Sequence, residues 1–124
     1  MQGYNTTTTP NVTGIIAITP GFTPKYVRIT VSSRLSSDNF AHLSEGAADS
    51  SGWTTNHTFM HDTTGGSTRR TAGNMGKIVS ALERVSGVIT EVNAASFDSF
   101  TATQVRINVT NVTQLYQYNI EIYG

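Results

Sequence analysis

The densest cluster of side chains able to do chemistry lies in the segment WTTNHTFMHD, residues 53–62. It contains His57 and His61, whose spacing places both imidazoles on one face of either a strand or a helix. On an extended strand, however, they lie about 13 Å apart, too far to share one metal ion. We therefore expect polar surface histidines beside a packed Phe59, and no metal. The alternative is an intersubunit metal site, in which a symmetry axis brings copies of one histidine together.

Other reactive side chains follow no pattern that is typical of catalysis. The acidic residues of the Ser- and Gly-rich segments stand at no informative spacing, and no G-x-S-x-G motif is present. The segment TTGGSTRR has a glycine pair but lacks the lysine of a phosphate-binding loop. Its Arg69 and Arg70 form a small basic patch, better suited to an intersubunit or surface salt bridge. We expect no catalytic residues, no cofactor and no enzymatic activity.

Composition narrows the classes of partner. The 124 residues include 8 basic and 8 acidic side chains and no cysteine. Zero net charge removes the field that collects phosphates, so nucleic acid is not an expected partner. Thiolate metal sites and disulfides are excluded. No apolar run approaches the roughly 20 residues that span a bilayer, and no signal peptide is recognisable, so we expect a soluble protein without membrane insertion.

The composition of the rest of the chain, which must position the histidine and arginine side chains, favours β-strands. The chain has 20 Thr, 12 Ser, 9 Asn and 11 Gly, and few good helix formers. Residues 1–12 have little to bury and are interpreted as an N-terminal arm, with Tyr4 and Pro10 as candidate contacts. This arm is either a disordered tail or a segment that orders against a neighbouring subunit. Residues 13–124 form the expected folded domain.

Alternating apolar residues predict four strands with one face on a core. They lie in the segments GIIAITPGF, where Pro20 and Gly21 close the strand, PKYVRITVSS, QVRINVT and LYQYNIEIY. The side chains expected to point inward are Ile16, Ile18, Val27, Ile29, Val31, Val105, Ile107, Val109, Tyr116, Tyr118, Ile120 and Ile122. The short link at 111–114 predicts that the last two strands form a hairpin.

The middle of the chain is less regular. We expect a strand around Phe40 to Leu43 followed by a loop, a short strand in NHTFMHD and a long mobile loop in TTGGSTRRTAGNMG. KIVSALERV fits a strand better than a helix, because flanking glycines and β-branched residues disfavour helix. GVITEV and SFDSFTA complete about eight strands. The predicted fold class is all-β, an antiparallel β-sandwich or jelly roll with a short N-terminal arm.

Three segments resemble a known family. PGFTPKYVRITVSS is similar to the G-F-x-P-k-y-V-x-[IV] segment of small β-sandwich domains in virion proteins of tailed bacteriophages. ITEVNAASFDSFTATQVRINV and QLYQYNIEIYG resemble the penultimate and closing parts of such domains. One departure is Phe100-Thr101-Ala102, which replaces a Gly-Phe pair often found there.

The resemblance implies a structural virion protein, made in the host cytoplasm and located on the virion surface. Our first hypothesis is a capsid decoration (cementing) protein that binds the assembled shell, with the major capsid protein or other virion proteins as partner. The resemblance also implies a homo-oligomer, with a trimer favoured. Because the chain is neutral, attachment should depend on shape and apolar contact and should survive moderate salt.

The alternative is a receptor-binding or adhesin module of a tail or head fibre. Its function would then lie in loops, especially residues 44–53 and 63–74, and its partner would be a host-surface glycan. Trp53 would stack on sugar rings in this case. If Trp53 instead packs in the core or between subunits, it has no such role.

Overall fold

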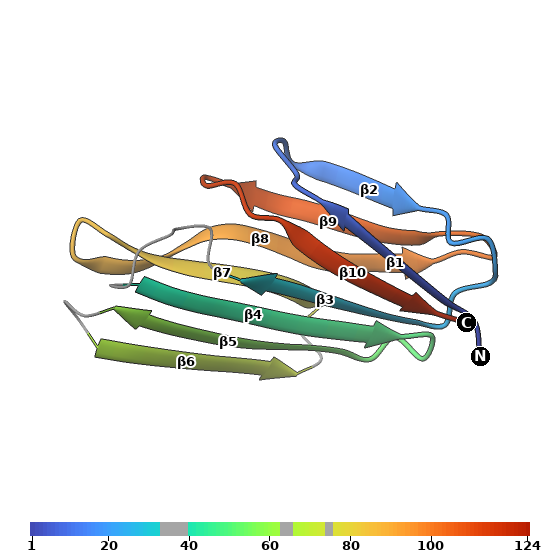
Figure 1. Cartoon of the computed structure of the whole chain (residues 1–124), viewed down its shortest axis with the longest axis horizontal. Helices are drawn as coiled ribbons and strands as arrows, with labels where there is room; N and C mark the ends of the chain where they lie inside the picture. Colours follow the sequence, from blue (N-terminus) through green and yellow to red (C-terminus); the bar gives the residue numbers. More distant parts are fainter. Residues whose placement is uncertain (33–39, 63–65, 74–75) are drawn as a thin grey trace.

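The computed structural model describes residues 1–32, 40–62, 66–73 and 76–124. Over these residues the chain forms ten strands in two antiparallel sheets (Figure 1), which confirms the expected β-sandwich. The strands are β1 (Gly3–Thr8), β2 (Gly14–Ile18), β3 (Tyr26–Ser32), β4 (Phe40–Asp49), β5 (Thr54–Asp62), β6 (Gly66–Gly73), β7 (Lys77–Val85), β8 (Val88–Phe100), β9 (Val105–Val112) and β10 (Tyr118–Tyr123).

Successive strands change sheet near the two ends of the chain, whereas most strands in the middle pair with the next strand along the chain. The six-stranded sheet has the order β1-β10-β3-β4-β5-β6, and the four-stranded sheet has the order β2-β9-β8-β7. The connections β1–β2, β2–β3, β6–β7 and β9–β10 therefore join strands of different sheets. The strands β3 to β6 form one meander and β7 to β9 another, so the complete topology is a sandwich of two meanders with a jelly-roll wrap at the ends of the chain.

The apolar core lies between β3, β10, β8 and β9. Val27, Ile29 and Val31 of β3 are fully buried, and the inward residues expected on β9 and β10 are buried as well. Ile16, Ile18 and Phe22 pack partly buried against this cluster. The period-two interpretation of these strands is confirmed, because each has one face on the core and one face toward solvent.

The predicted hairpin of β9 and β10 is wrong. The two strands belong to different sheets, and the link 113–117 carries the chain from one sheet to the other. Tyr116 in this link is 1% exposed, and the backbone N–H of Gln114 donates to the carbonyl of Val92 at 2.9 Å. The link is therefore a crossover anchored by Tyr116 and Gln114, with Leu115 at the surface.

Strand lengths in the middle of the chain also differ from expectation. β4 continues to Asp49 rather than ending at Leu43, because Gly46 lies at a close approach to β7 and Ala47 and Ala48 are buried strand residues, not loop residues. β6 lies within the expected long loop, whose residues 63–65 and 74–75 are outside the described residues. GVITEV and SFDSF belong to one strand, β8. β7 is a strand as preferred, not a helix.

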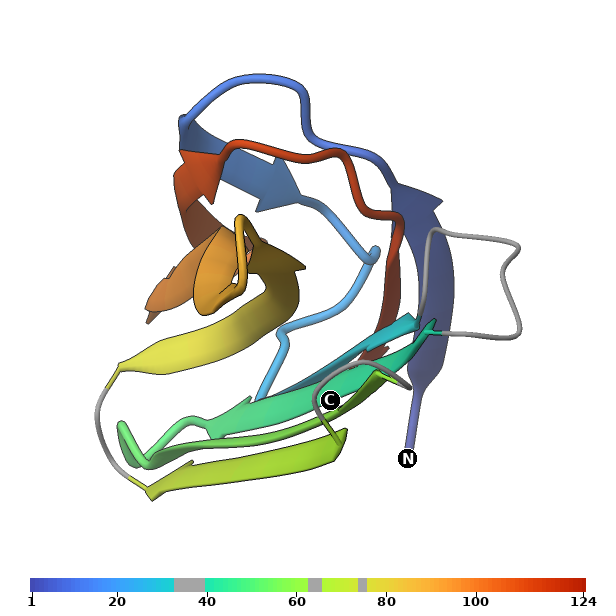
Figure 2. The ribbon, with the colours of Figure 1, turned by 90° about the vertical axis from the view of Figure 1, so that its left-hand side faces the viewer.

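β7 is an edge strand that packs against the inner face of the six-stranded sheet. Figure 2 shows β7, in yellow, passing over β4 and β5, in green. An ideal Cβ on Gly46 would lie 1.8 Å from the carbonyl oxygen of Ile78, so the two backbones meet where no other residue fits. Residues of β7 from Ile78 to Glu83 are all buried, which explains why this strand lacks the usual alternation.

Residues 3–8 of the N-terminal arm form β1. This strand pairs with β10 of the same chain, from Gly3 opposite Tyr123 to Thr8 opposite Tyr118. It is mostly exposed and lies at the edge of the six-stranded sheet.

Candidate binding surface

The two histidines of the 53–62 segment lie on β5 and are exposed. Their register places them on the outer face of the six-stranded sheet, with His57 opposite Glu45 of β4. Among the described residues there is no group of three or more side chains able to hold a metal ion.

The other candidate residues are not brought together. Tyr4 is 36% exposed on β1, whereas Pro10 is buried just after that strand. Arg69 and Arg70 belong to β6, and their side chains lie outside the described residues. Trp53 is 47% exposed at the β4–β5 turn, so it is not a core residue.

A polar network fills the space between β7 and the inner face of β4 and β5. Asn56 donates from Nδ2 to the Oγ of Ser44 (3.1 Å) and to the carbonyl of Ile78 (3.2 Å). Ser44 Oγ also accepts the backbone N–H of Ser80 (3.0 Å), and Thr58 donates to the carbonyl of Ser80 (2.9 Å). Side chains of the six-stranded sheet thus form hydrogen bonds with the backbone of β7, the edge strand of the four-stranded sheet. Because these side chains are buried, they are not accessible to a ligand.

A second buried polar cluster joins three segments of the chain. Tyr116 donates its hydroxyl to Glu83 Oε2 at 2.7 Å, and the ring of His42 packs edge-on against Tyr116 at 5.4 Å. Burial lowers the pKa of His42, although the Ser80 backbone and the Glu83 charge act in the opposite direction. This cluster joins β4, β7 and the β9–β10 link, and its three side chains are buried.

Charged side chains on the outer faces pair with one another. Arg28 contacts Glu121 at 2.7 Å and Glu45 at 3.5 Å. The hydrogen bond and charge of Glu121 raise the pKa of Arg28. Further ion pairs join Lys77 to Glu91 and Arg106 to Asp98. At these positions basic and acidic side chains offset one another.

The most site-like feature is one end of the sandwich, where residues 19–25, 50–53 and 101–104 meet; we call it the loop end. Ser50 N–H donates to the carbonyl of Lys25 (2.8 Å), and Lys25 N–H donates to that of Tyr123 (2.8 Å). Asp49 accepts hydrogen bonds from the backbones of Ser51 (2.9 Å) and Trp53 (3.3 Å). The Ser51 hydroxyl also donates to this carboxylate, and this bond, followed by the backbone bonds, lowers the pKa of Asp49. Together the bonds fix the turn that carries Trp53.

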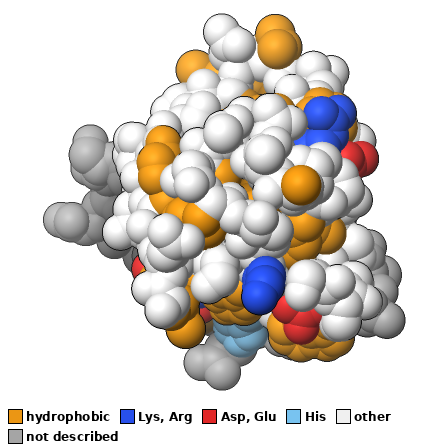
Figure 3. All heavy atoms as spheres, turned by 90° about the vertical axis from the view of Figure 1, so that its right-hand side faces the viewer, with side chains coloured by type: hydrophobic (Ala, Val, Ile, Leu, Met, Phe, Trp, Pro, Cys, Tyr) orange, Lys and Arg blue, Asp and Glu red, His pale blue; other side chains and the backbone are white. Residues whose placement is uncertain are grey.

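A small groove of about 280 Å³ opens at the loop end. Its lining combines the ring of Phe22 with threonine hydroxyls and the β8–β9 turn, namely Thr19, Gly21, Phe22, Thr23, Ala102 and Thr103. Gln104 Nε2 lies 3.4 Å from Thr19 Oγ1 and connects the two loops. Figure 3 views this end of the molecule and shows apolar side chains reaching the surface between polar ones. An aromatic ring bordered by hydroxyls is suited to contact with a protein loop or one sugar ring.

Sequence reasoning identified Trp53 but missed Phe22. The sequence feature that could have identified Phe22 is an aromatic residue between proline and glycine residues, in PGFTP. Such a segment is typical of a loop, so the alternation of a strand does not predict where this side chain points.

Comparisons with known proteins give no relative: no protein family, curated protein or solved structure matches this chain. Within the described parts of the chain, no helix is long and apolar enough to cross a membrane.

Proposed function

We propose that this chain is a structural protein of a bacteriophage virion, a capsid decoration protein that attaches to the assembled shell through its loop end. The observation that carries the proposal is a rigid loop end that presents Trp53 and the Phe22 groove. Residues 20–25 of this end belong to the PGFTPK segment that resembles virion proteins. The same segment thus links the resemblance to the surface.

The rest of the molecule is consistent with a role in surface contact. Arg28 and Arg106 on the described outer faces are in ion pairs, and the chain has no net charge, so we expect attachment to rely on shape and apolar contact more than on electrostatic steering. The chain is assigned to the virion surface, with the major capsid protein as partner.

The proposal is tested by binding labelled protein to particles from which the chain has been removed. Trp53→Ala and Phe22→Ala should each weaken attachment at least tenfold, because aromatic anchors dominate contact energy. Leu115→Ala is the matched control: Leu115 is 51% exposed but lies in the β9–β10 link at the other end of the sandwich (Figure 1), so attachment should persist. Equal binding by all variants would contradict attachment through the loop end.

A receptor-binding module of a fibre is the second candidate, favoured by the exposure of Trp53 and by a groove the size of one sugar ring. It requires glycan binding by the isolated protein. On a glycan array, Trp53→Phe should then retain binding, because an aromatic ring still stacks, while Trp53→Ala loses it. Absence of glycan binding by the native chain excludes this candidate.

A further inference from the structure

The free edge of β1 lacks the usual protection against pairing with another strand. Among the described residues, β1 pairs only with β10, and its register has no bulge. Its sequence, GYNTTT, has no charge and no proline. Exposed edges of natural sheets are normally blocked by such features. The two sheets have four edge strands, β1, β6, β2 and β7. Of these, β7 accepts hydrogen bonds from and donates them to the side chains of Ser44, Asn56 and Thr58, whereas among the described residues no such bond reaches the free edge of β1.

The hydrogen-bond register identifies which groups of β1 are unpaired. Gly124 N–H donates to the carbonyl of Gln2 at 3.1 Å, one position beyond the pair of Gly3 and Tyr123. Hydrogen-bonded and non-hydrogen-bonded pairs alternate along an antiparallel ladder. Because Gln2 and Gly124 form a hydrogen-bonded pair, the backbone groups of Tyr4, Thr6 and Thr8 also bond to β10. The N–H and C=O groups of Gly3, Asn5 and Thr7 therefore point away from the sheet.

We propose that a second copy of this chain pairs with this edge, β1 antiparallel to β1 about a two-fold axis at Asn5. In this register Gly3 lies opposite the partner's Thr7, Asn5 opposite the partner's Asn5, and Thr7 opposite the partner's Gly3. Each of these pairs exchanges two N–H···O bonds, so all outward groups of the strand are satisfied. The two six-stranded sheets then become one continuous sheet.

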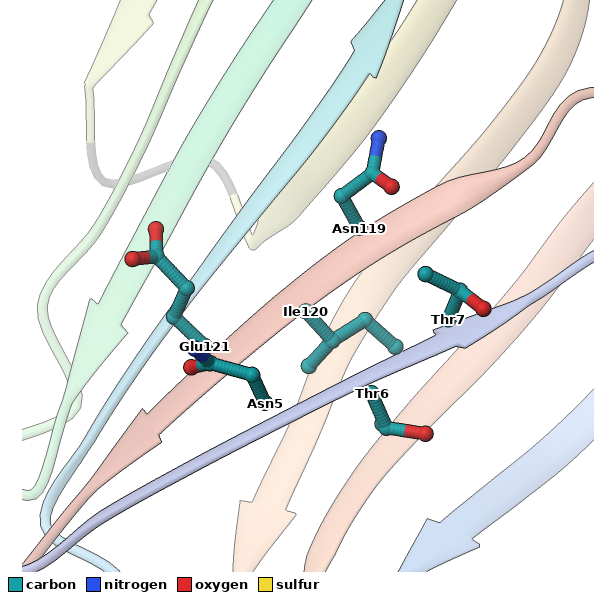
Figure 4. Close-up of a pocket in the computed structure, with 6 residues that line it drawn as sticks. All are labelled: Asn5, Thr6, Thr7, Asn119, Ile120 and Glu121. Carbon is teal, nitrogen blue, oxygen red and sulfur yellow. The ribbon is translucent and has the colours of Figure 1, made fainter.

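The side chains of β1 suit an identical partner. Figure 4 shows Asn5 and Thr7 beside Glu121 and Asn119 of β10, along a shallow groove on the outer face. At the axis two neutral Asn5 amides meet, so no like charges oppose each other. Tyr4, which is 36% exposed, lies across from the partner's Thr6 in a close, non-hydrogen-bonded pair. This inference does not depend on the proposed function, and it replaces the expected trimer with a two-fold pair.

Single cysteines in this cysteine-free chain test the register directly. With Asn5→Cys, the two Cα atoms lie about 5.5 Å apart across the axis, within reach of a disulfide. With Thr7→Cys, the two copies lie about 14 Å apart, beyond its reach. Mild oxidation should therefore cross-link Asn5→Cys into a dimer and leave Thr7→Cys monomeric. Equal cross-linking of both variants, or of neither, would overturn the register.

Sedimentation of the unmodified chain over a concentration series provides the second readout. The native protein should reach twice its 13.4 kDa mass as concentration rises. Asn5→Pro removes one outward N–H but none that bonds to β10, so it should lower dimerisation at least tenfold; Asn5→Ser, which keeps the N–H, should dimerise like the native chain. A native protein that stays monomeric throughout refutes the proposal, as does an Asn5→Pro variant that is folded by circular dichroism and dimerises normally.

Discussion

Gly46 marks the place where the two sheets come closest. A Cβ at this position would meet the carbonyl oxygen of Ile78 at 1.8 Å and its carbonyl carbon at 2.6 Å, and both are backbone atoms that cannot rotate away. Gly46→Ala should therefore lower the free energy of unfolding by about 3 kcal/mol or more, measured by urea denaturation.

Gly3→Ala is the control for this prediction. Its Cβ would meet only the movable ring of Tyr123, at 3.3 Å, so the loss should be small. Equal stability of Gly46→Ala and Gly3→Ala would show that β7 does not pack against Gly46.

His42 should make stability depend on pH. Burial lowers its pKa in the folded state below the ordinary value of 6.5, so the unfolded chain binds a proton more readily than the folded chain. The stability linked to His42 is therefore complete above about pH 6.5 and is lost as pH falls below it, with a slope of at most about 1.4 kcal/mol per pH unit.

Urea denaturation between pH 7.5 and about pH 5 measures this slope. His42→Gln should flatten this slope even if the variant is less stable at every pH. An unchanged slope in His42→Gln would contradict the assignment.

At the scale of elements, the edge of β7 depends on side chains of β4 and β5. Asn56 supplies its amide to Ser44 Oγ and to the carbonyl of Ile78, all in the interior. Asn56→Ala removes this donor to the buried carbonyl of Ile78 and leaves Ser44 Oγ with only the N–H of Ser80, so it should cost about 1–3 kcal/mol in thermal or urea unfolding.

Asn119→Ala provides the matched comparison. This exposed amide donates to the carbonyl of Thr30 at 3.2 Å, where water can replace it, so the change should stay within about 0.5 kcal/mol. A loss at Asn119 as large as that at Asn56 would argue against the role given to burial.

The register of β3 gives another contrast between adjacent residues. Ile29 is fully buried, and Ile29→Ala should cost about 2–5 kcal/mol in unfolding free energy. The side chain of Arg28 is 44% exposed, and its ion pairs with Glu121 and Glu45 should contribute about 1 kcal/mol or less. Greater damage from Arg28→Ala than from Ile29→Ala would mean that β3 faces the other way.

The strands differ in how well their buried residues could be predicted from the sequence. β3, β9 and β10 alternate because only one of their faces is buried, and their inward residues were identified one by one. β4, β5 and β7 were poorly defined because their interior side chains include Ser44, Asn56 and Thr58, residue types that usually face water. They are buried because they bond to the edge of β7, a contact between distant segments that no local pattern reveals.

The candidate surface was predictable only in part, for a similar reason. Trp53 stands out in a Ser- and Gly-rich segment, but the sequence left open whether it packs in the core, and only the structure shows that it is exposed. The Phe22 groove forms only where the β2–β3 loop meets the β8–β9 turn, far apart in the chain. Sequence alone could propose the first residue but not the groove.

At the scale of the whole molecule, the zero net charge of the chain predicts how its attachment to particles depends on salt. Ionic strength on the order of 0.3 M screens exposed charges strongly but leaves apolar contact intact. Binding of labelled protein to particles should therefore be retained at this salt concentration. Release by salt alone would mean that attachment is electrostatic.

The most direct measurement of the proposed function is cryo-electron microscopy of the virion that carries this chain. We expect density for this ten-stranded sandwich on the capsid surface, with the Phe22 groove and Trp53 turned toward the shell. Density confined to fibre ends would support receptor binding instead of decoration. Particles that lack such density, although the protein is made in infected cells, would contradict a structural role in the virion.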